Sequence, residues 1–179
     1  MAINSLNQRI HAQAFRSVFV ACLFYVNVWA IIHILRQLPS WLLRMDSWEI
    51  FGTVSYLLTA ALIESSLLVL LIAFFAILIP SSILKGKFSA QGVMFATIST
   101  IGAVGLHYGG VNILAWGLNQ FLFTGSLFIL TAVGMFFLVA RVQRVEIILN
   151  SLSQHLTGLS YVYLFIDILA VLIVIIRNV

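Results

Sequence analysis

Five long apolar stretches constrain the fold of this chain more than any other feature of its sequence. A helix needs about 20 apolar residues to cross the hydrocarbon core of a bilayer, and each stretch is close to that length or longer. The sequence therefore predicts an all-α integral membrane protein, a bundle of about five transmembrane helices forming a single transmembrane domain over residues 1–179. The predicted spans are approximately residues 18–35, 50–79, 92–109, 119–140 and 159–176.

The composition excludes a soluble globular protein. Hydrophobic residues make up 63% of the chain and charged residues 8%, with a mean hydropathy of +1.15, whereas soluble domains carry roughly a quarter charged residues. The single cysteine, Cys22, provides neither a disulfide framework nor a CxxC redox pair. No small-residue cleavage site follows the first apolar stretch, so we interpret it as a retained span and not as a signal peptide.

Basic residues between the spans predict the orientation. The net charge of +4 is expected to reflect loop topology and not an affinity for nucleic acid. Positive residues favour the cytoplasmic side, so we expect a multi-pass protein of the cell inner membrane with its N-terminus in the cytoplasm and its C-terminus outside. Five spans place Arg9, Arg16, Lys85, Lys87, Arg141 and Arg144 on the N-terminal side, and Arg36, Arg44 and Arg177 on the other.

Local signals mark several span ends. Asp46 followed by Glu49 predicts a capping box at the start of the second span, and Pro80 is expected to end that span. The Gly109–Gly110 pair is the best breaker between the third and fourth spans. No charge lies near this pair, so the number of spans between residues 92 and 140 stays open, with a kinked or re-entrant segment as the alternative.

Residues 142–157 are predicted to form an amphipathic helix on the cytoplasmic side. Its apolar residues recur at helical spacing. Two arrangements are open, because such a helix either lies on the membrane surface or extends the fourth span. The apolar positions are Val142, Val145, Ile148, Leu149, Leu152 and Leu156.

Three polar residues lie next to the midpoints of predicted spans, namely Asn27, Glu64 and Asp167. We expect them to share a layer in the middle of the membrane. Charged groups are costly there, and no Lys or Arg lies within any span to neutralise the acids. Glu64 and Asp167 are therefore expected to be protonated or hydrogen-bonded, and to face protein.

Polar and small residues beside the two acids indicate close contacts with neighbouring helices. Ser160, Tyr163 and Ala170 share a helical face with Asp167, and Ala60 and Ala61 precede Glu64 by one turn. Small residues allow membrane helices to approach closely. This pattern favours a structural layer that bonds helices within the bundle or to a partner subunit. A proton or cation path, or contact with a bound lipid or pigment, is the alternative.

Two histidines form a second candidate site. His33 and His107 fall near the outer ends of the first and third spans, at similar depth. Neutral imidazoles ligate haem iron or a chlorophyll-type magnesium, and glycines on the third span would leave room for a flat ring. The competing interpretation is an interfacial aromatic edge, because Tyr25, Trp29 and His33 follow at steps of four. The glycines are Gly102, Gly105 and Gly109.

Catalytic and metal-binding motifs are absent from the sequence, so we do not expect an enzyme or a metal site. We expect a non-catalytic subunit of a larger membrane assembly, bioenergetic or transport-related, whose partners are other membrane subunits and the lipid bilayer, with no nucleic acid. No cofactor is expected in that case. One alternative is a haem- or chlorophyll-binding subunit for electron transfer or light harvesting. The other is a proton or cation conductor that uses Glu64 and Asp167.

Overall fold

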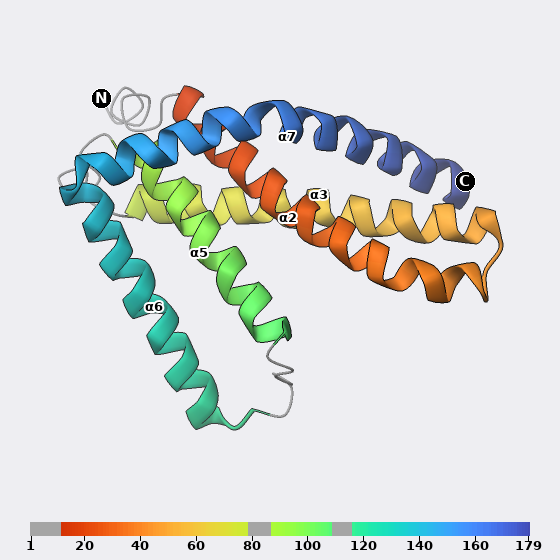
Figure 1. The fold of residues 1–179 in the computed structure, drawn as a ribbon, viewed down its shortest axis with the longest axis horizontal. Helices are drawn as coiled ribbons and strands as arrows, with labels where there is room; N and C mark the ends of the chain where they lie inside the picture. Colours follow the sequence, from red (N-terminus) through yellow and green to blue (C-terminus); the bar gives the residue numbers. More distant parts are fainter. Residues whose placement is uncertain (1–11, 79–86, 109–115) are drawn as a thin grey trace.

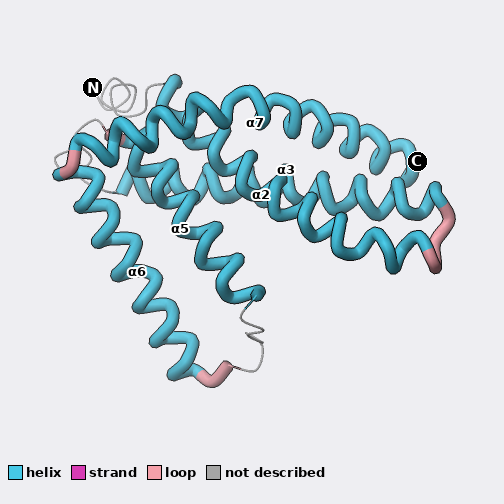
Figure 2. The backbone as a smooth tube through the Cα atoms, viewed as in Figure 1, coloured by secondary structure: helices cyan, strands magenta, loops and turns pink. Residues whose placement is uncertain are grey.

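The computed structural model describes residues 12–78, 87–108 and 116–179, and within these ranges all regular structure is helical (Figures 1 and 2). All five helices are long and apolar enough to cross a membrane. The protein is thus an all-α bundle with the pattern of a multi-pass membrane protein. The helices are α2 (Ala12–Leu42), α3 (Ser47–Leu78), α5 (Phe88–Tyr108), α6 (Leu118–Arg141) and α7 (Gln143–Asn178).

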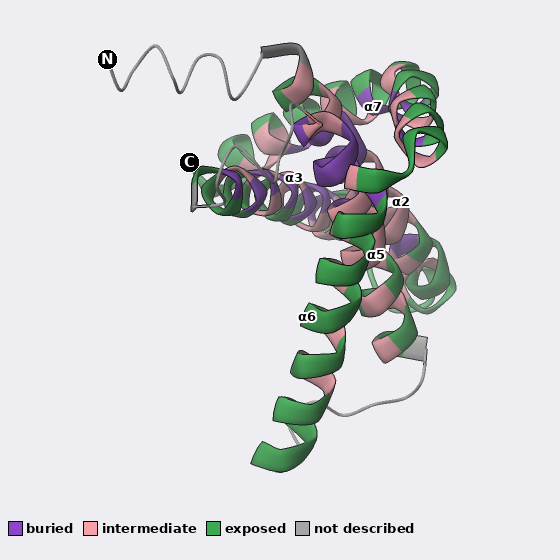
Figure 3. Ribbon diagram, turned by 90° about the vertical axis from the view of Figure 1, so that its left-hand side faces the viewer, coloured by how far each residue is buried: buried purple, intermediate pink, exposed green. Residues whose placement is uncertain are grey.

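The helices gather at one end and diverge at the other. Helices α2, α3 and α7 lie side by side up to the end of the bundle that holds the C-terminus, whereas α5 and α6 turn away from them (Figure 1). Helix α6 is the most exposed, and Val139 near its end is its one buried residue (Figure 3). Helix α6 is therefore exposed over most of its length.

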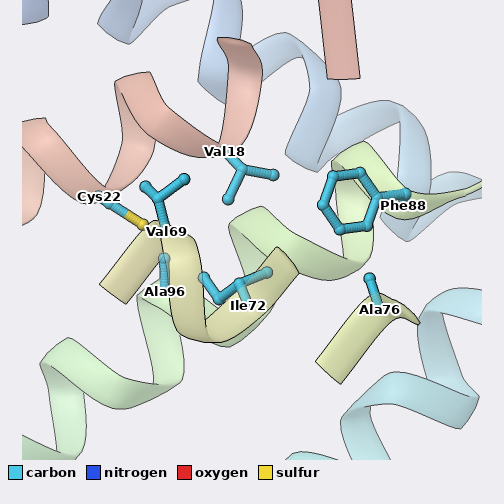
Figure 4. Close-up of a cluster of buried hydrophobic side chains, with 7 residues drawn as sticks. All are labelled: Val18, Cys22, Val69, Ile72, Ala76, Phe88 and Ala96. Carbon is cyan, nitrogen blue, oxygen red and sulfur yellow. The ribbon is translucent and has the colours of Figure 1, made fainter. Parts of the chain in front are cut away.

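The main core cluster joins α2, α3 and α5 where they cross (Figure 4). Between membrane helices, van der Waals packing of small side chains supplies much of the attraction. Gly92 shows how close this approach is, because a Cβ there would lie 2.5 Å from Cγ2 of Val18. The cluster contains Val18, Cys22, Val69, Ile72, Ala76, Phe88 and Ala96.

Polar contacts hold the two ends of the bundle. Nζ of Lys87 lies 2.7 Å from Oε2 of Glu146, which ties α7 to the start of α5. At the opposite end, the Arg177 guanidinium donates to the Trp48 carbonyl at 3.0 Å. The same guanidinium lies over Gly52, where any Cβ would overlap it. Lys87 and Arg177 thus lie at opposite ends, as the predicted five-span arrangement requires.

Each of the five helices overlaps one predicted span, and the predicted span ends at residues 79 and 109 lie outside the described residues. The amphipathic segment belongs to a different element than predicted. Residues 143–157 are helical, but they are the first part of α7 and continue the fifth span. They neither extend the fourth span nor form a helix of their own, because the chain breaks at Val142, whose φ of −104° and ψ of 101° are extended. Leu149, Ser153 and Leu156 are buried against the bundle, whereas Ile148 of the predicted apolar face is exposed.

The capping signal at the start of α3 is also observed. The backbone N–H of Asp46 donates to Oε2 of Glu49 at 3.2 Å, which is the carboxylate half of a capping box. Pro80 and the Gly109–Gly110 pair lie outside the described residues.

Candidate functional site

Asn27 and Asp167 form a buried polar pair between α2 and α7. Nδ2 of Asn27 donates to Oδ2 of Asp167 at 2.9 Å, and also to the Leu23 carbonyl at 3.1 Å. Asn27 is 1% exposed and Asp167 is fully buried. Two members of the predicted polar layer are therefore brought together inside the bundle.

A stripe of small residues on α7 makes this pair possible. Ser160 and Ala170, which the sequence analysis placed on the same face as Asp167, are both buried. The Ser160 hydroxyl donates to the Val20 carbonyl of α2 at 2.9 Å, two turns before Asp167. Small side chains let the backbones approach, and their hydroxyl and carboxyl groups then bond across the interface.

The pair retains unused hydrogen-bonding capacity. Oδ1 of Asn27 and Oδ1 of Asp167 are both buried without a partner. Neither forms an ion pair within the described part of the chain. Enclosed between two helices and away from a cation, the pair serves best as a contact that fixes α2 against α7.

Glu64 does not join this pair, and it does not face the interior of the described bundle. Its side chain is exposed on the outward side of α3, beside the exposed Ile63 and Leu67. The buried residues of α3 next to Glu64 in the sequence are instead Ala61 and Ser65. Glu64 therefore projects from the bundle among apolar side chains.

Glu64 and Asp167 lie at similar positions along the bundle. Helices α3 and α7 run antiparallel (Figure 1), and Leu58 and Ala170 belong to one buried cluster. Asp167 precedes Ala170 by about one turn, and Glu64 follows Leu58 by somewhat less than two turns. The two acids are thus separated by about one helical turn in depth, one facing inward and the other outward.

The histidine site is only partly assembled. The rings of Trp29 and His107 meet edge to face, with centroids 4.9 Å apart and an interplanar angle of 86°. His33 follows Trp29 by one turn of α2, so the two histidines lie near the same end of the α2–α5 contact. His33 is half-buried and His107 is exposed. Among the residues described, no three His, Cys, Asp or Glu side chains cluster as a metal site would require.

The glycines of α5 give limited support to a bound ring. A Cβ on Gly105 would meet nothing, so the space beside it is open. A Cβ on Gly102 would contact the Phe128 ring at 3.5 Å, so α6 occupies that side. Gly109 lies outside the described residues.

The sequence analysis did not single out Gln91, which the structure places in an unusual position. Its side chain is 3% exposed, and neither Nε2 nor Oε1 has a hydrogen-bond partner. It lines an apolar cavity between α3, α5 and α6. The sequence feature that could have drawn attention to Gln91 is its position, an amide within the first turn of an apolar helix and close to the predicted boundary of the third span.

The described residues thus present three polar features of different kinds. Asn27 and Asp167 are paired inside, Glu64 is exposed outside, and Gln91 is buried with no partner. Comparisons of the chain with protein-family models, with curated proteins and with solved structures found no match. Function is therefore inferred from these residues alone.

Proposed function

We propose that the protein is a non-catalytic subunit of a larger membrane assembly, bioenergetic or transport-related, and that Glu64 is its docking point. The observation that carries this proposal is the exposure of Glu64 halfway along α3. At 1.5 Å per residue, Glu64 is more than about 20 Å along the axis from either end of the helix. Its short side chain cannot reach the headgroups from there.

A carboxyl group in that position is energetically unfavourable unless it has a hydrogen-bond partner. Inserting an acidic side chain at the centre of a membrane helix costs about 2.5–3.5 kcal/mol on insertion scales. Acids within membrane helices almost always face a bundle interior or a water-filled cavity. Because Glu64 faces outward from its own bundle, a second protein is the natural source of its hydrogen-bond partner.

The surface around Glu64 suits a transmembrane helix. We call it the α3 outer face and define it by the exposed residues Tyr56, Ala60, Ile63, Glu64 and Leu67. Ala60 precedes Glu64 by one turn, so a helix can approach closely there. The neighbouring aliphatic side chains offer packing surface without competing hydrogen bonds.

Charge complementarity selects the occupant. The matching residue is a donor at mid-membrane depth, such as a lysine, an arginine or an amide, on a helix of a different protein. A second copy of this chain would place another Glu64 opposite the first, which supplies like groups and no basic donor. The proposed partner is therefore a heterologous membrane subunit.

We also propose that this assembly lies in the cell inner membrane with the N-terminus of this chain in the cytoplasm. Arg141 and Arg144 flank the turn between α6 and α7, near the end that holds Lys87. Arg44 and Arg177 lie at the opposite end, beside the start of α3. The larger basic group marks the cytoplasmic side under the positive-inside rule.

Affinity purification from native membranes in a mild detergent tests the proposal. Wild-type protein is expected to bring down another membrane protein in constant ratio, and Glu64→Leu is expected to lose at least ten-fold of it. Ile63→Leu, an adjacent conservative change on the same face, is the control and should retain the partner. Recovery of the wild type as a lone monomer, or equal recovery of the partner with Glu64→Leu, would refute the docking role.

The same preparation distinguishes the proposed subunit role from the two alternative functions. A visible absorption band that disappears in His107→Ala would instead indicate a tetrapyrrole subunit that uses His33 and His107. A proton flux in liposomes that Glu64→Gln and Asp167→Asn abolish would indicate a conductor. The subunit proposal predicts neither result.

A further inference from the structure

An apolar cavity of about 550 Å³ lies between α3, α5 and α6. It forms where α6 diverges from α3 (Figure 1), beside the core cluster that includes Ile72, Ala76 and Phe88 (Figure 4). Its volume falls within the range of about 300–1,000 Å³ that is typical of small-molecule sites. The aromatic rings of Phe95, Phe128 and Phe136 line much of it.

Gln91 is the one polar side chain among the residues that line this cavity. Buried amides are almost always hydrogen-bonded, because an unpaired donor or acceptor in an apolar environment is costly. Here both the donor Nε2 and the acceptor Oε1 are unpaired. The cavity therefore combines an apolar wall with one unsatisfied donor and one unsatisfied acceptor, which is the arrangement of a ligand site.

The position of Gln91 along α5 indicates how a ligand would lie. Gln91 is within the first turn of α5, and Lys87 and Glu146 form their ion pair just before it. Polar and charged residues of this kind gather near membrane interfaces. Leu71 and Phe75 extend the wall of the cavity along α3, two and three turns beyond Glu64. A head group at Gln91 thus lies near the interface and away from the α3 outer face.

We propose that this cavity binds a single-chain amphiphile whose neutral head group both donates and accepts a hydrogen bond, namely a long-chain acid, alcohol or amide. The head donates to Oε1 of Gln91 and accepts from its Nε2, and the chain packs along the phenylalanine rings. A head that only accepts, such as an ester or a quinone, leaves Oε1 unpaired. A phosphodiester head requires a cation, and none of the described residues that line the cavity is a Lys or an Arg.

Photolabelling of the full-length protein in nanodiscs tests the proposal with a diazirine-bearing palmitic acid as the probe. Unlabelled palmitic acid and hexadecanol are the competitors that donate and accept, and methyl palmitate is the competitor that only accepts. We expect the label on peptides of α5 and α6. We expect the acid and the alcohol to displace it at concentrations at least ten-fold below those needed for the ester.

Two variants separate the head-group contact from the cavity itself. Gln91→Leu removes the amide at similar volume, so the probe should bind at least ten-fold more weakly and the acid should lose its advantage over the ester. Ala132→Phe fills the cavity from α6 and should abolish labelling. Leu130→Phe, on the same helix but not lining the cavity, is the matched control and should label like the wild type.

Specific results would overturn the proposal. Equal competition by the ester and the acid in the wild type would remove the role of Gln91. Labelling unchanged by Ala132→Phe would place the probe elsewhere, for example on the general lipid-facing surface. If instead a side chain of a partner protein fills the cavity, crosslinks from position 132 to that protein would replace lipid labelling, and the amphiphile proposal would fall while docking at Glu64 stands.

Discussion

Asn27 and Asp167 are 140 positions apart in the chain and share a 2.9 Å hydrogen bond in the middle of the bundle. Glu64 lies within about one turn of the same depth, yet it faces outward. The two acids therefore have different surroundings, although both lie in similar apolar helices. Oδ2 of Asp167 accepts a hydrogen bond from its own chain and joins α7 to α2, whereas we propose that Glu64 meets a partner from outside.

Removing the carboxyl of Asp167 is expected to destabilise the isolated protein. Asp167→Leu leaves the buried Asn27 amide with the Leu23 carbonyl as its remaining acceptor, and losing one acceptor for a buried donor typically costs about 1–3 kcal/mol in the free energy of unfolding. Asp167→Asn keeps an acceptor and should cost less than about 1 kcal/mol. Reversible unfolding in mixed micelles, followed by circular dichroism, measures both values. If Asp167→Leu is as stable as the wild type, the pair does not hold the helices together.

Replacing Glu64 should have the opposite effect on the isolated protein. Glu64→Leu removes a polar group from an outward, apolar surface and breaks no hydrogen bond that the described structure contains. We expect the free energy of unfolding in detergent to stay the same or to rise slightly. The same unfolding assay, run beside Asp167→Leu, makes the comparison direct. A loss of about 1 kcal/mol or more would show that Glu64 has an internal partner.

Enlarging Gly52 should loosen the contact between α3 and the end of α7. Gly52→Leu forces the Arg177 guanidinium away from the Trp48 carbonyl, and we expect a loss of about 1–3 kcal/mol, the usual cost of overpacking. Gly105→Ala is the control, because a Cβ there meets nothing. It should be neutral or slightly stabilising, since alanine favours a helix by about 1 kcal/mol over glycine. Additivity of Gly52→Leu with Arg177→Ala would show that the two sites are independent.

Cysteine labelling tests the proposed orientation. Cys22 is buried and serves as a low background. A cysteine placed at Val179 should react with a membrane-impermeant maleimide in intact cells, whereas one at Gln143 should react only after the membrane is opened. Gel-shift detection distinguishes the two. The reverse pattern would place the N-terminus outside and contradict the positive-inside assignment.

Much of the fold could be predicted from the sequence because apolar length is a local property. Each of the five helices overlaps one predicted span, and the stripe of Ser160 and Ala170 lies on the face of α7 that also carries the buried Asp167. The break at Val142 was not predictable in this way. No Gly or Pro marks it, so no local signal in the sequence indicates where α6 ends.

The sites were harder to predict than the spans, for two physical reasons. Glu64 lies in a helix that is apolar on every side, so no polar face shows which way its side chain points. Gln91 lies at the edge of its span, where an amide is expected to meet water. Its burial depends on how α3 and α6 diverge, which is a tertiary feature. The exposure of Glu64 and the burial of Gln91 are both determined by how the neighbouring helices pack.

Photocrosslinking from the α3 outer face in native membranes tests the docking role of Glu64 most directly. A benzophenone side chain in place of Leu67 lies one turn from Glu64 on the same exposed surface. The expected result, read by mass spectrometry, is a crosslink to a transmembrane helix of another protein that carries a basic or amide residue at the matching depth. Glu64→Leu should remove this crosslink. A crosslink to lipid alone, or to a second copy of this chain, would contradict the proposed role.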